Sequence, residues 1–312
     1  MRANTLDARA AAKGAAAGRR PSDWRLYAML AAPAIIVFIF SYIPIGGVLI
    51  AFQNYSPDKG VLGSEFVGLK WFRVFFAMPD SARIVANTVA IAVGKIACSQ
   101  LASVVFALLL NEVRGAAYKR SLQTITYFPH FLSWVIIGTV FIDMLSTRGL
   151  VNQILGAFGT APKFFLGDPR LFQPTAVLLE TWKEFGWGAI MYLAAISNIS
   201  PDLYEAATID GAGRLKQALH VTLPGIRGIA LMLAVLALGG ILNAGFEQIL
   251  VLYNPSVYET GDIVDTFIYR YGLLDAQFSM SAAIGLFKSL IGLALMLAAN
   301  WAAARFSDYR VL

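Results

Sequence analysis

Charged residues are scarce in this sequence. They make up 14% of its 312 residues, against about 25% in a typical soluble domain, while 58% are hydrophobic. So few charged residues cannot cover the surface of an ordinary globular protein with groups that water solvates. The composition therefore argues against a soluble domain. The composition instead predicts a membrane protein.

Residues that carry chemistry are also few. The one cysteine, Cys98, lies in an apolar run, so no disulfide framework can form. There are two histidines, His130 and His220, and neither a CxxC nor an HExxH motif, so no metal site is expected. No GxxxxGK[ST] loop is present, because Gly94-Lys95 lacks the upstream glycine and the hydroxyl residue. We therefore predict no catalytic residue, no metal and no cofactor in this chain.

Long hydrophobic runs, by contrast, are abundant. A membrane-spanning helix needs roughly 20 mostly apolar residues. Six runs qualify, and they predict an all-α membrane protein with six transmembrane helices. They cover residues 27–52, 86–110, 122–145, 174–197, 225–250 and 282–304. The fourth is the weakest, because the sequence ETWKEF places three charges inside it.

The two ends of the chain differ from the middle. Residues 1–26 are polar, Ala-rich and basic, and predict a disordered cytoplasmic tail. A membrane domain is expected over 27–306, followed by a short cytoplasmic tail at 307–312. A cleaved signal peptide is the alternative for the N-terminus. The first apolar run is longer than an h-region of about 7–15 residues, and no A-x-A site follows it, which favours an uncleaved first span.

The distribution of Lys and Arg predicts the orientation. With the N-terminus in the cytoplasm, the cytoplasmic segments carry fourteen of these residues and the outside segments carry eight. Because the positive side faces the cytoplasm, both termini and residues 199–224 are expected there. Residues 53–85, 146–173 and 252–280 are expected outside. This topology accounts for the net charge of +6, so a nucleic-acid partner is not needed.

A short polar stretch, EAATIDGAGRLKQALHVTLP (205–224), interrupts the hydrophobic sequence. Ser200 is a good N-cap and predicts that a helix begins just before the stretch. Gly211 predicts that this helix ends, since glycine tolerates the left-handed conformation. A second short helix is expected over 214–220, and Pro224 is expected to end it.

The alanines of this stretch leave two interpretations open. Ala206 and Ala207 make a nearly bare helix face, which lets another protein pack closely. The same pattern fits an ordinary amphipathic helix that links two spans at the membrane surface. The helix signals alone do not choose between a docking surface and a linker.

The order of residues does choose. The chain has EAA at 205–207, three residues, Gly211, nine residues, Val221, one residue, and LP at 223–224. This closely resembles the EAA motif, which marks the permease subunits of binding-protein-dependent ABC importers. Other stretches resemble the polysaccharide-type branch of carbohydrate-uptake permeases. They are YIPIGGVLIAFQNYSPDKGVLGSEFVGLKWF (42–72), YFPHFLSWVI (127–136), WKEFGW (182–187) and NAGFEQILVLYNPSVYETGDIVDTFIYRYGL (243–273).

The resemblance implies a type I ABC importer permease core in a bacterial inner membrane, in contact with lipid. It implies a second homologous permease, a dimeric ATPase that binds ATP and Mg, an extracytoplasmic sugar-binding protein and a carbohydrate substrate. The polar stretch becomes a coupling loop at 199–224 that docks on the ATPase, with Leu223 and Pro224 fixing its angle to the fifth span. The residues assigned to coupling are Glu205, Ala206, Ala207, Asp210, Gly211, Leu223 and Pro224.

Polar and aromatic residues inside the predicted spans suggest a sugar path, because sugars need hydrogen-bonding groups and flat apolar faces. The path residues are Trp182, Glu184, Trp187, Tyr192, Asn243, Glu247 and Lys288. Two alternatives stay open. Trp and Tyr also anchor helices at the membrane surface, and intramembrane charges such as Lys95, Glu180 and Lys183 also pair internally, as Glu247 can with Lys288.

Two other functions fit a hydrophobic chain of this kind. An ion-coupled secondary sugar carrier would use buried carboxylates as a proton relay. A membrane scaffold or sensor would need no transport path. Carriers often contain inverted repeats, which the sequence does not show, and the EAA spacing argues against both alternatives.

Overall fold

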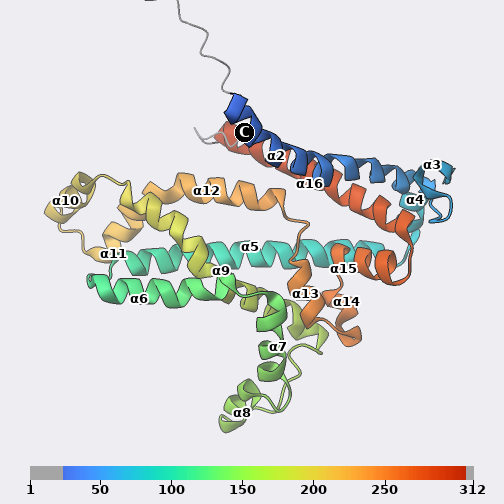
Figure 1. Ribbon diagram of the computed structural model, residues 1–312. Coiled ribbons are helices and arrows are strands. Elements are labelled where there is room, and N and C mark those ends of the chain that lie inside the picture. The colour runs from blue at the N-terminus through green and yellow to red at the C-terminus, as the bar shows by residue number, and fades with distance from the viewer. Residues whose placement is uncertain (1–23, 307–312) are drawn as a thin grey trace, which may run out of the picture. The chain divides into compact units, whose positions relative to one another are not determined.

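The computed structural model describes residues 24–306, which are mostly helical (Figure 1). The described residues form two compact units, divided between Leu49 and Ile50. The predicted C-terminal tail (307–312) lies outside the described residues, as does the predicted N-terminal tail (1–26) except for its last three residues. Those three residues belong to the first helix.

Five helical segments of the described chain are long and apolar enough to cross a membrane. They cover Leu26–Phe52, Ser81–Asn111, Trp134–Ala157, Arg214–Gly239 and Phe278–Trp301. A sixth long helix, α9 (Pro169–Ser197), has 29 residues and extends about 44 Å. It is more polar because Glu180, Lys183 and Glu184 lie inside it. The predicted all-α membrane fold is therefore confirmed.

The first unit is built around one span. Helix α2 (Trp24–Val37) continues through a π-helical turn, η1 (Phe38–Tyr42), into a 3₁₀ segment, η2 (Ile43–Phe52). The π turn precedes Pro44, which has no N–H to donate to the carbonyl of Phe40. Most apolar side chains of this span are exposed. A helix that is apolar all round needs lipid or another subunit against it.

The second unit begins with a small hairpin. The hairpin consists of β1 (Gln53–Asn54) and β2 (Glu65–Phe66), with the short helix α3 (Gly60–Gly63) between them. Helix α4 (Lys70–Ala77) follows. The two strands pair antiparallel, with Gln53 opposite Phe66. The indole N–H of Trp71 donates to the carbonyl of Gln53 over 2.9 Å, which ties α4 back to the hairpin.

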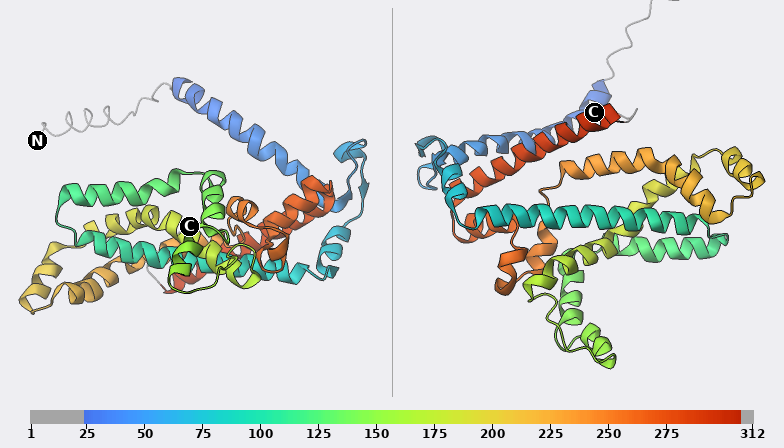
Figure 2. Two further views of the ribbon diagram at one scale, coloured as in Figure 1. Left: turned by 90° about the horizontal axis from the view of Figure 1, so that it is seen from below. Right: turned by 180° about the vertical axis from the view of Figure 1, so that it is seen from behind.

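Four long helices form the body of the second unit. Helix α5 (Ser81–Asn111) packs along α9, and α12 (Leu223–Gly239) packs on α16 (Phe278–Phe306). Helix α6 (Ala116–Tyr127) also packs on α9, and Figures 1 and 2 show α6 and α12 roughly aligned with α5, with the chain running in the opposite direction. Buried apolar side chains such as Ile91, Phe172 and Ile249 fill the centre.

The third predicted span, 122–145, is wrong as one continuous helix. Helix α6 ends at Tyr127, a 3₁₀ turn, η3 (Phe128–Phe131), follows, and α7 (Trp134–Leu145) starts anew. Ser133 has extended backbone, and its hydroxyl accepts a hydrogen bond from the Ile136 N–H. A serine in this position begins a helix and does not continue one. Helix α8 (Leu150–Ala157) then follows α7.

The fifth predicted span, 225–250, is also interrupted. Helix α12 ends at Gly239, residues 240–245 are irregular, and α13 (Phe246–Leu252) follows. Gly245 has φ +84°, a left-handed conformation that glycine adopts without strain. We refer to residues 240–245 as the α12–α13 break.

Pro224 does not end the second helix of the polar stretch, contrary to the prediction. Helix α11 (Arg214–Gln217), a π-helical turn η4 (Ala218–Thr222) and α12 form one helical segment of 26 residues. Pro224 cannot donate to the carbonyl of His220, and the wider π turn before it accommodates the missing hydrogen bond. The same arrangement precedes Pro44.

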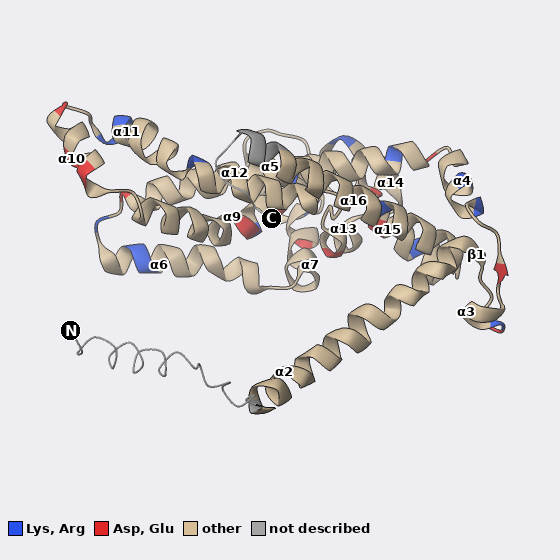
Figure 3. Cartoon of the chain, turned by 90° about the horizontal axis from the view of Figure 1, so that it is seen from above, with Lys and Arg blue, Asp and Glu red and all other residues tan. Residues whose placement is uncertain are grey.

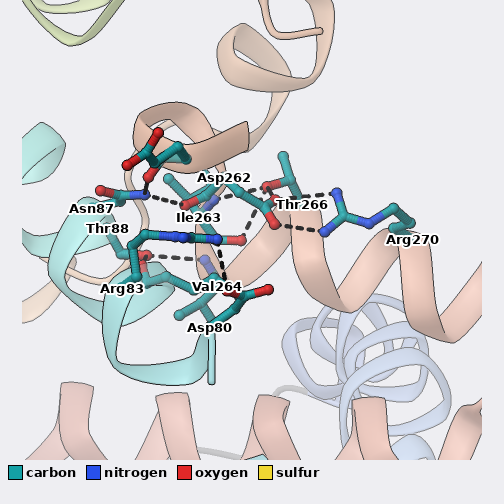
Figure 4. A network of polar contacts seen from close by, with 11 residues as sticks. Asp80, Arg83, Asn87, Thr88, Asp262, Ile263, Val264, Thr266 and Arg270 are labelled. Atoms are coloured by element: carbon teal, nitrogen blue, oxygen red, sulfur yellow. Dashed lines mark hydrogen bonds and ion pairs between the residues drawn. The ribbon is translucent and has the colours of Figure 1, made fainter. Parts of the chain in front are cut away.

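The segment after α13 is short and compact. It contains η5 (Pro255–Val257), α14 (Tyr258–Gly261), α15 (Val264–Tyr269) and a π-helical turn, η6 (Arg270–Leu274). Asp262 lies at the centre of a polar network there (Figure 4). The Arg270 guanidinium donates to both oxygens of the Asp262 carboxylate over 3.3 and 2.5 Å, and the Thr266 hydroxyl donates to one of them over 2.7 Å. Asn87 of α5 donates to the Asp262 carbonyl over 3.2 Å, so the network fastens this segment to α5.

The pKa values of Arg270 and of the nearby Tyr253 are both shifted by their surroundings. Burial alone would lower the pKa of Arg270, but its hydrogen bonds and attraction to Asp262 outweigh that effect and raise it. Burial, together with the neighbouring Tyr258, raises the pKa of Tyr253 to about 12. Tyr253 therefore stays neutral and Arg270 stays charged at physiological pH.

Candidate functional site

The predicted coupling loop forms a helical hairpin at one end of the second unit. Its first helix, α10 (Pro201–Ile209), begins where predicted, and the Ser200 hydroxyl accepts from the N–H of Asp202 over 3.3 Å. Figure 1 places α10 and α11 at the end of the unit opposite α3 and α4. Figure 3 shows charged residues at these two ends, with long stretches of uncharged helix between them.

Gly211 closes α10 as predicted. It has φ +76°, and its N–H donates to the carbonyl of Thr208 over 3.0 Å. The N–H of Ala212 donates to the carbonyl of Ala207 over 2.8 Å. These two bonds form a Schellman motif, which requires a left-handed residue at the position of Gly211.

Side chains tie the two arms of the hairpin together. The Gln217 amide donates to the hydroxyl of Thr208 over 3.0 Å and to the carbonyl of Ala212 over 2.9 Å. The hydroxyls of Tyr204 and Thr222 hydrogen-bond to each other over 2.9 Å. The sequence analysis did not find these residues, because a contact between two arms of a loop has no local sequence signal. The loop is therefore preformed.

The outer surface of this loop is unusually apolar for a polar stretch. Ile209 is 87% exposed and Leu215 is 73% exposed. The coupling residues Glu205, Ala206, Asp210, Gly211, Leu223 and Pro224 are exposed, and Ala207 is half-buried. Exposed apolar side chains beside an acidic residue on a preformed loop fit a docking surface better than a linker.

The aromatic path residues on α9 lie in two settings. Trp182 and Trp187 are exposed, and their rings pack against Phe141 and against His130. Tyr192 is buried in an apolar cluster with Ala107, Ala189, Ile196 and Ile226. The structure therefore does not bring the three aromatic residues together on one surface.

The charged path residues are held by partners. Glu184 pairs with His130 over 2.7 Å and with Lys183 over 3.0 Å. Lys288 pairs with Asp265 over 2.6 Å, so its partner is not Glu247, as the alternative interpretation allowed. Glu247 is exposed at the start of α13.

A cavity of about 300 Å³ with a mixed apolar and polar lining lies between α5, α9 and the α12–α13 break. Its polar lining residues are Lys95, Ser99, Gln100, Glu180, Glu184 and Asn243. The Ser99 hydroxyl and one Glu180 oxygen are buried and make no hydrogen bond to the described residues. Buried polar atoms normally have partners, so this lining can accept or donate bonds to a hydroxylated ligand or to water.

A second cavity of about 530 Å³ adjoins the first and shares Gly240 and Asn243 with it. Lys288, Asp265 and Ser289 lie in its lining. The two cavities bring together three of the seven predicted path residues, Glu184, Asn243 and Lys288. Lys95 and Glu180 were visible in the sequence only as intramembrane charges, and Ser99 and Gln100 carried no signal. Within residues 24–306, no cluster of three His, Cys, Asp or Glu side chains could hold a metal ion.

Several membrane-spanning helices, cavities among them and a preformed external loop fit a transport permease. Residues 100–308 match the family described as "Binding-protein-dependent transport system inner membrane component". The chain belongs to this family, and it is a permease subunit of a binding-protein-dependent ABC importer.

Similar proteins of known type support this assignment. The chain is 42% identical to the polygalacturonan/rhamnogalacturonan transport system permease protein YteP of Bacillus subtilis, over 91% of this chain and 88% of that one. It is 41% identical to protein LplB of the same organism, over 92% and 90%. A chain of a bacterial ABC transporter that imports the acidic polysaccharide alginate superposes with a TM-score of 0.83 at 37% identity, over 91% of this chain and 96% of that chain.

Proposed function

We propose that this chain translocates an oligo- or polysaccharide, delivered by an extracytoplasmic binding protein, through the bacterial inner membrane. The preformed loop closed by Gly211 carries the proposal, since its geometry suits docking on a separate motor. Similarity to permeases named for polygalacturonan and alginate supports a carbohydrate substrate. A secondary carrier would need no such loop.

The proposed assembly has four kinds of subunit. This chain pairs with a second homologous permease, and two copies of an ATPase bind ATP and Mg at the cytoplasmic face. The binding protein docks from outside, as supported by a similar alginate transporter solved with its alginate pentasaccharide-bound periplasmic protein. Exposed apolar helices such as α2 meet lipid or the second permease. No nucleic acid takes part.

Within this chain, the roles divide between the loop and the cavities. Glu205, Ala206, Ala207, Asp210 and Gly211 form the docking surface, while Leu223 and Pro224 set the angle of the loop to α12. Glu184, Asn243 and Lys288 line the sugar path with Ser99 and Glu180. Trp182, Trp187, Tyr192 and Glu247 complete the proposed path at other levels of α9 and α13.

The function predicts dependence on a separate motor. The purified chain is expected to hydrolyse no ATP, because its sequence has no phosphate-binding loop. The chain should be purified together with the partner permease and the ATPase and reconstituted in liposomes. Addition of the binding protein should then give ATP hydrolysis and sugar uptake. The sugars to test are an alginate oligosaccharide, an oligogalacturonide and an arabino-oligosaccharide. Hydrolysis by the purified chain alone, or a full assembly that takes up none of these sugars, would contradict the proposal.

The orientation gives a second prediction. In a Cys98→Ser background, Ser256→Cys should react with an impermeant thiol reagent in intact cells, since the segment 252–280 is expected outside. Ile209→Cys should react only after the cells are permeabilised. Both positions are exposed, so accessibility reports the side of the membrane. Labelling of Ile209→Cys in intact cells would place the coupling loop outside and contradict the predicted topology.

A further inference from the structure

Two buried lysines have the same unusual arrangement. Lys95 of α5 and Lys183 of α9 have side chains only 8% exposed. Each ammonium donates to a backbone carbonyl in one of the two interrupted spans. Lys95 Nζ donates to the carbonyl of Ala244 over 2.6 Å, and Lys183 Nζ donates to the carbonyl of His130 over 2.9 Å.

Each lysine also has a glutamate beside it. Glu180 lies 3.9 Å from Lys95, and Glu184 lies 3.0 Å from Lys183. Irregular backbone at membrane depth leaves carbonyls that water cannot satisfy, so an internal donor stabilises it. A buried ammonium is itself costly unless a carboxylate neutralises it. Each Lys–Glu pair is neutral overall, and its ammonium satisfies a backbone carbonyl of one helix interruption. The two pairs therefore stabilise the two interruptions.

The backbone at the α12–α13 break is shaped around Lys95. Gly245 follows the carbonyl that the ammonium binds, and a Cβ atom at Gly245 would collide with Lys95 Nζ. Glycine at position 245 therefore leaves room for the ammonium beside the Ala244 carbonyl. No other residue type leaves this space with the φ of +84° seen at Gly245.

The two breaks differ in what they connect. The helical segment that ends at the α12–α13 break begins at Arg214, in the coupling loop. The interruption held by Lys183 lies between α6 and α7, which are not continuous with that loop. A displacement of the coupling loop therefore reaches the Ala244 carbonyl, which Lys95 binds, along the helical segment that begins in the loop. Helix α9, which carries Lys183, also leads into the loop, but the His130 carbonyl lies in η3, which only packs on α9.

We propose that Lys95 is a positioning residue that holds the α12–α13 break to α5, so that motor-driven displacement of α12 reshapes the sugar cavity. The inference rests on the proposed transport function and adds to it a mechanical role for one residue. Lys95 acts through the Ala244 carbonyl, whose neighbours Asn243 and Gly245 line the cavity. If Lys95 is absent, the break is free to yield, and ATP hydrolysis no longer moves the cavity lining.

The test compares two charge-removing variants in the complete reconstituted transporter, with the sugar that the wild type takes up. The Lys95→Met/Glu180→Gln double variant removes both charges of the pair, so that no uncompensated charge stays buried. Glu180→Gln alone is the reference, because Glu180 lines the cavity and its loss is then common to both variants. Lys183→Met is the matched control, because Glu184 keeps its bond to His130. The measured quantity is sugar taken up per ATP hydrolysed, alongside the thermal stability of each purified complex.

For the double variant, we expect uptake per ATP to fall about tenfold below that of Glu180→Gln alone, within the range of typical allosteric coupling. Hydrolysis stimulated by sugar-loaded binding protein should persist. Lys183→Met should lower thermal stability and leave uptake per ATP unchanged.

Three outcomes would overturn the inference alone. They are a ratio in the double variant no lower than that of Glu180→Gln alone, an equal loss of ratio in Lys183→Met, and a parallel fall of uptake and stimulated hydrolysis. The last outcome would make Lys95 a sugar ligand. Failure of the wild-type assembly to take up any of the three sugars would overturn the proposed function and this inference with it.

Discussion

Gly211→Val is expected to abolish ATP-driven uptake while the permease still folds and inserts. The residue has φ +76°, which costs a β-branched side chain about 1–3 kcal/mol. A Cβ at this position would meet nothing within 4 Å, so the effect is backbone strain and not a clash. The strain is relieved by opening the Schellman motif, which redirects α10 and removes the docking surface. Sugar uptake and pull-down of the ATPase by the variant measure the loss.

Gly213 provides the matched control two residues further on. It has φ −70° and ψ 169°, a region that valine readily adopts, and a Cβ there also meets nothing within 4 Å. Gly213→Val should therefore keep both uptake and ATPase binding. Wild-type uptake by Gly211→Val, at wild-type expression, would show that the hairpin is only a linker.

Arg270→Met is expected to cause the largest loss of stability among single substitutions in the segment after α13. The Asp262 side chain is 6% exposed, and the substitution leaves its carboxylate buried without its counter-charge. Breaking such a pair typically costs about 3–5 kcal/mol. The Thr266 hydroxyl still donates to Asp262, so we expect about 3 kcal/mol, at the low end of that range. Thermal unfolding of the purified permease in detergent measures it.

Arg83→Met is the control for this effect. Arg83 pairs with Asp80 over 2.7 Å, close to the network (Figure 4), but the two side chains are 44% and 58% exposed. Surface pairs of this kind contribute about 0–1 kcal/mol, so the unfolding temperature should scarcely change. Equal destabilisation by the two variants would mean that burial of Asp262 is not what makes the network strong.

The features that the sequence predicted correctly depend on neighbouring residues. Ser200 caps a helix and Gly211 ends it through local hydrogen bonds, and both were readable from residue type and spacing. Apolar length likewise predicted the spans at 27–52 and 282–304. The EAA spacing indicated the ABC importer permease family, which the comparisons confirm, while the coupling role of residues 199–224 stays a prediction.

The features that escaped prediction depend on distant partners. Hydropathy cannot show that a span is broken when residues within the irregular backbone, such as Leu132 and Leu242, are themselves apolar. Lys95 and Ala244 are 149 residues apart, and their bond is what makes the second break tolerable. Pro224 was expected to end a helix by its local chemistry, but the π turn absorbs the missing bond. The partner of Lys288 was likewise decided by the fold, which brings Asp265 nearer than Glu247.

The uninterrupted helix from Arg214 to Gly239 also has a consequence for scale. Its 26 residues make a rod about 39 Å long, so a tilt of about 10° at the loop moves the far end by about 7 Å. That arc exceeds the 2.6 Å bond between Lys95 and Ala244 and is comparable to the width of a sugar ring. In the proposed assembly, a small rotation of the loop would therefore produce a displacement of the size of a sugar ring at the far end of this segment.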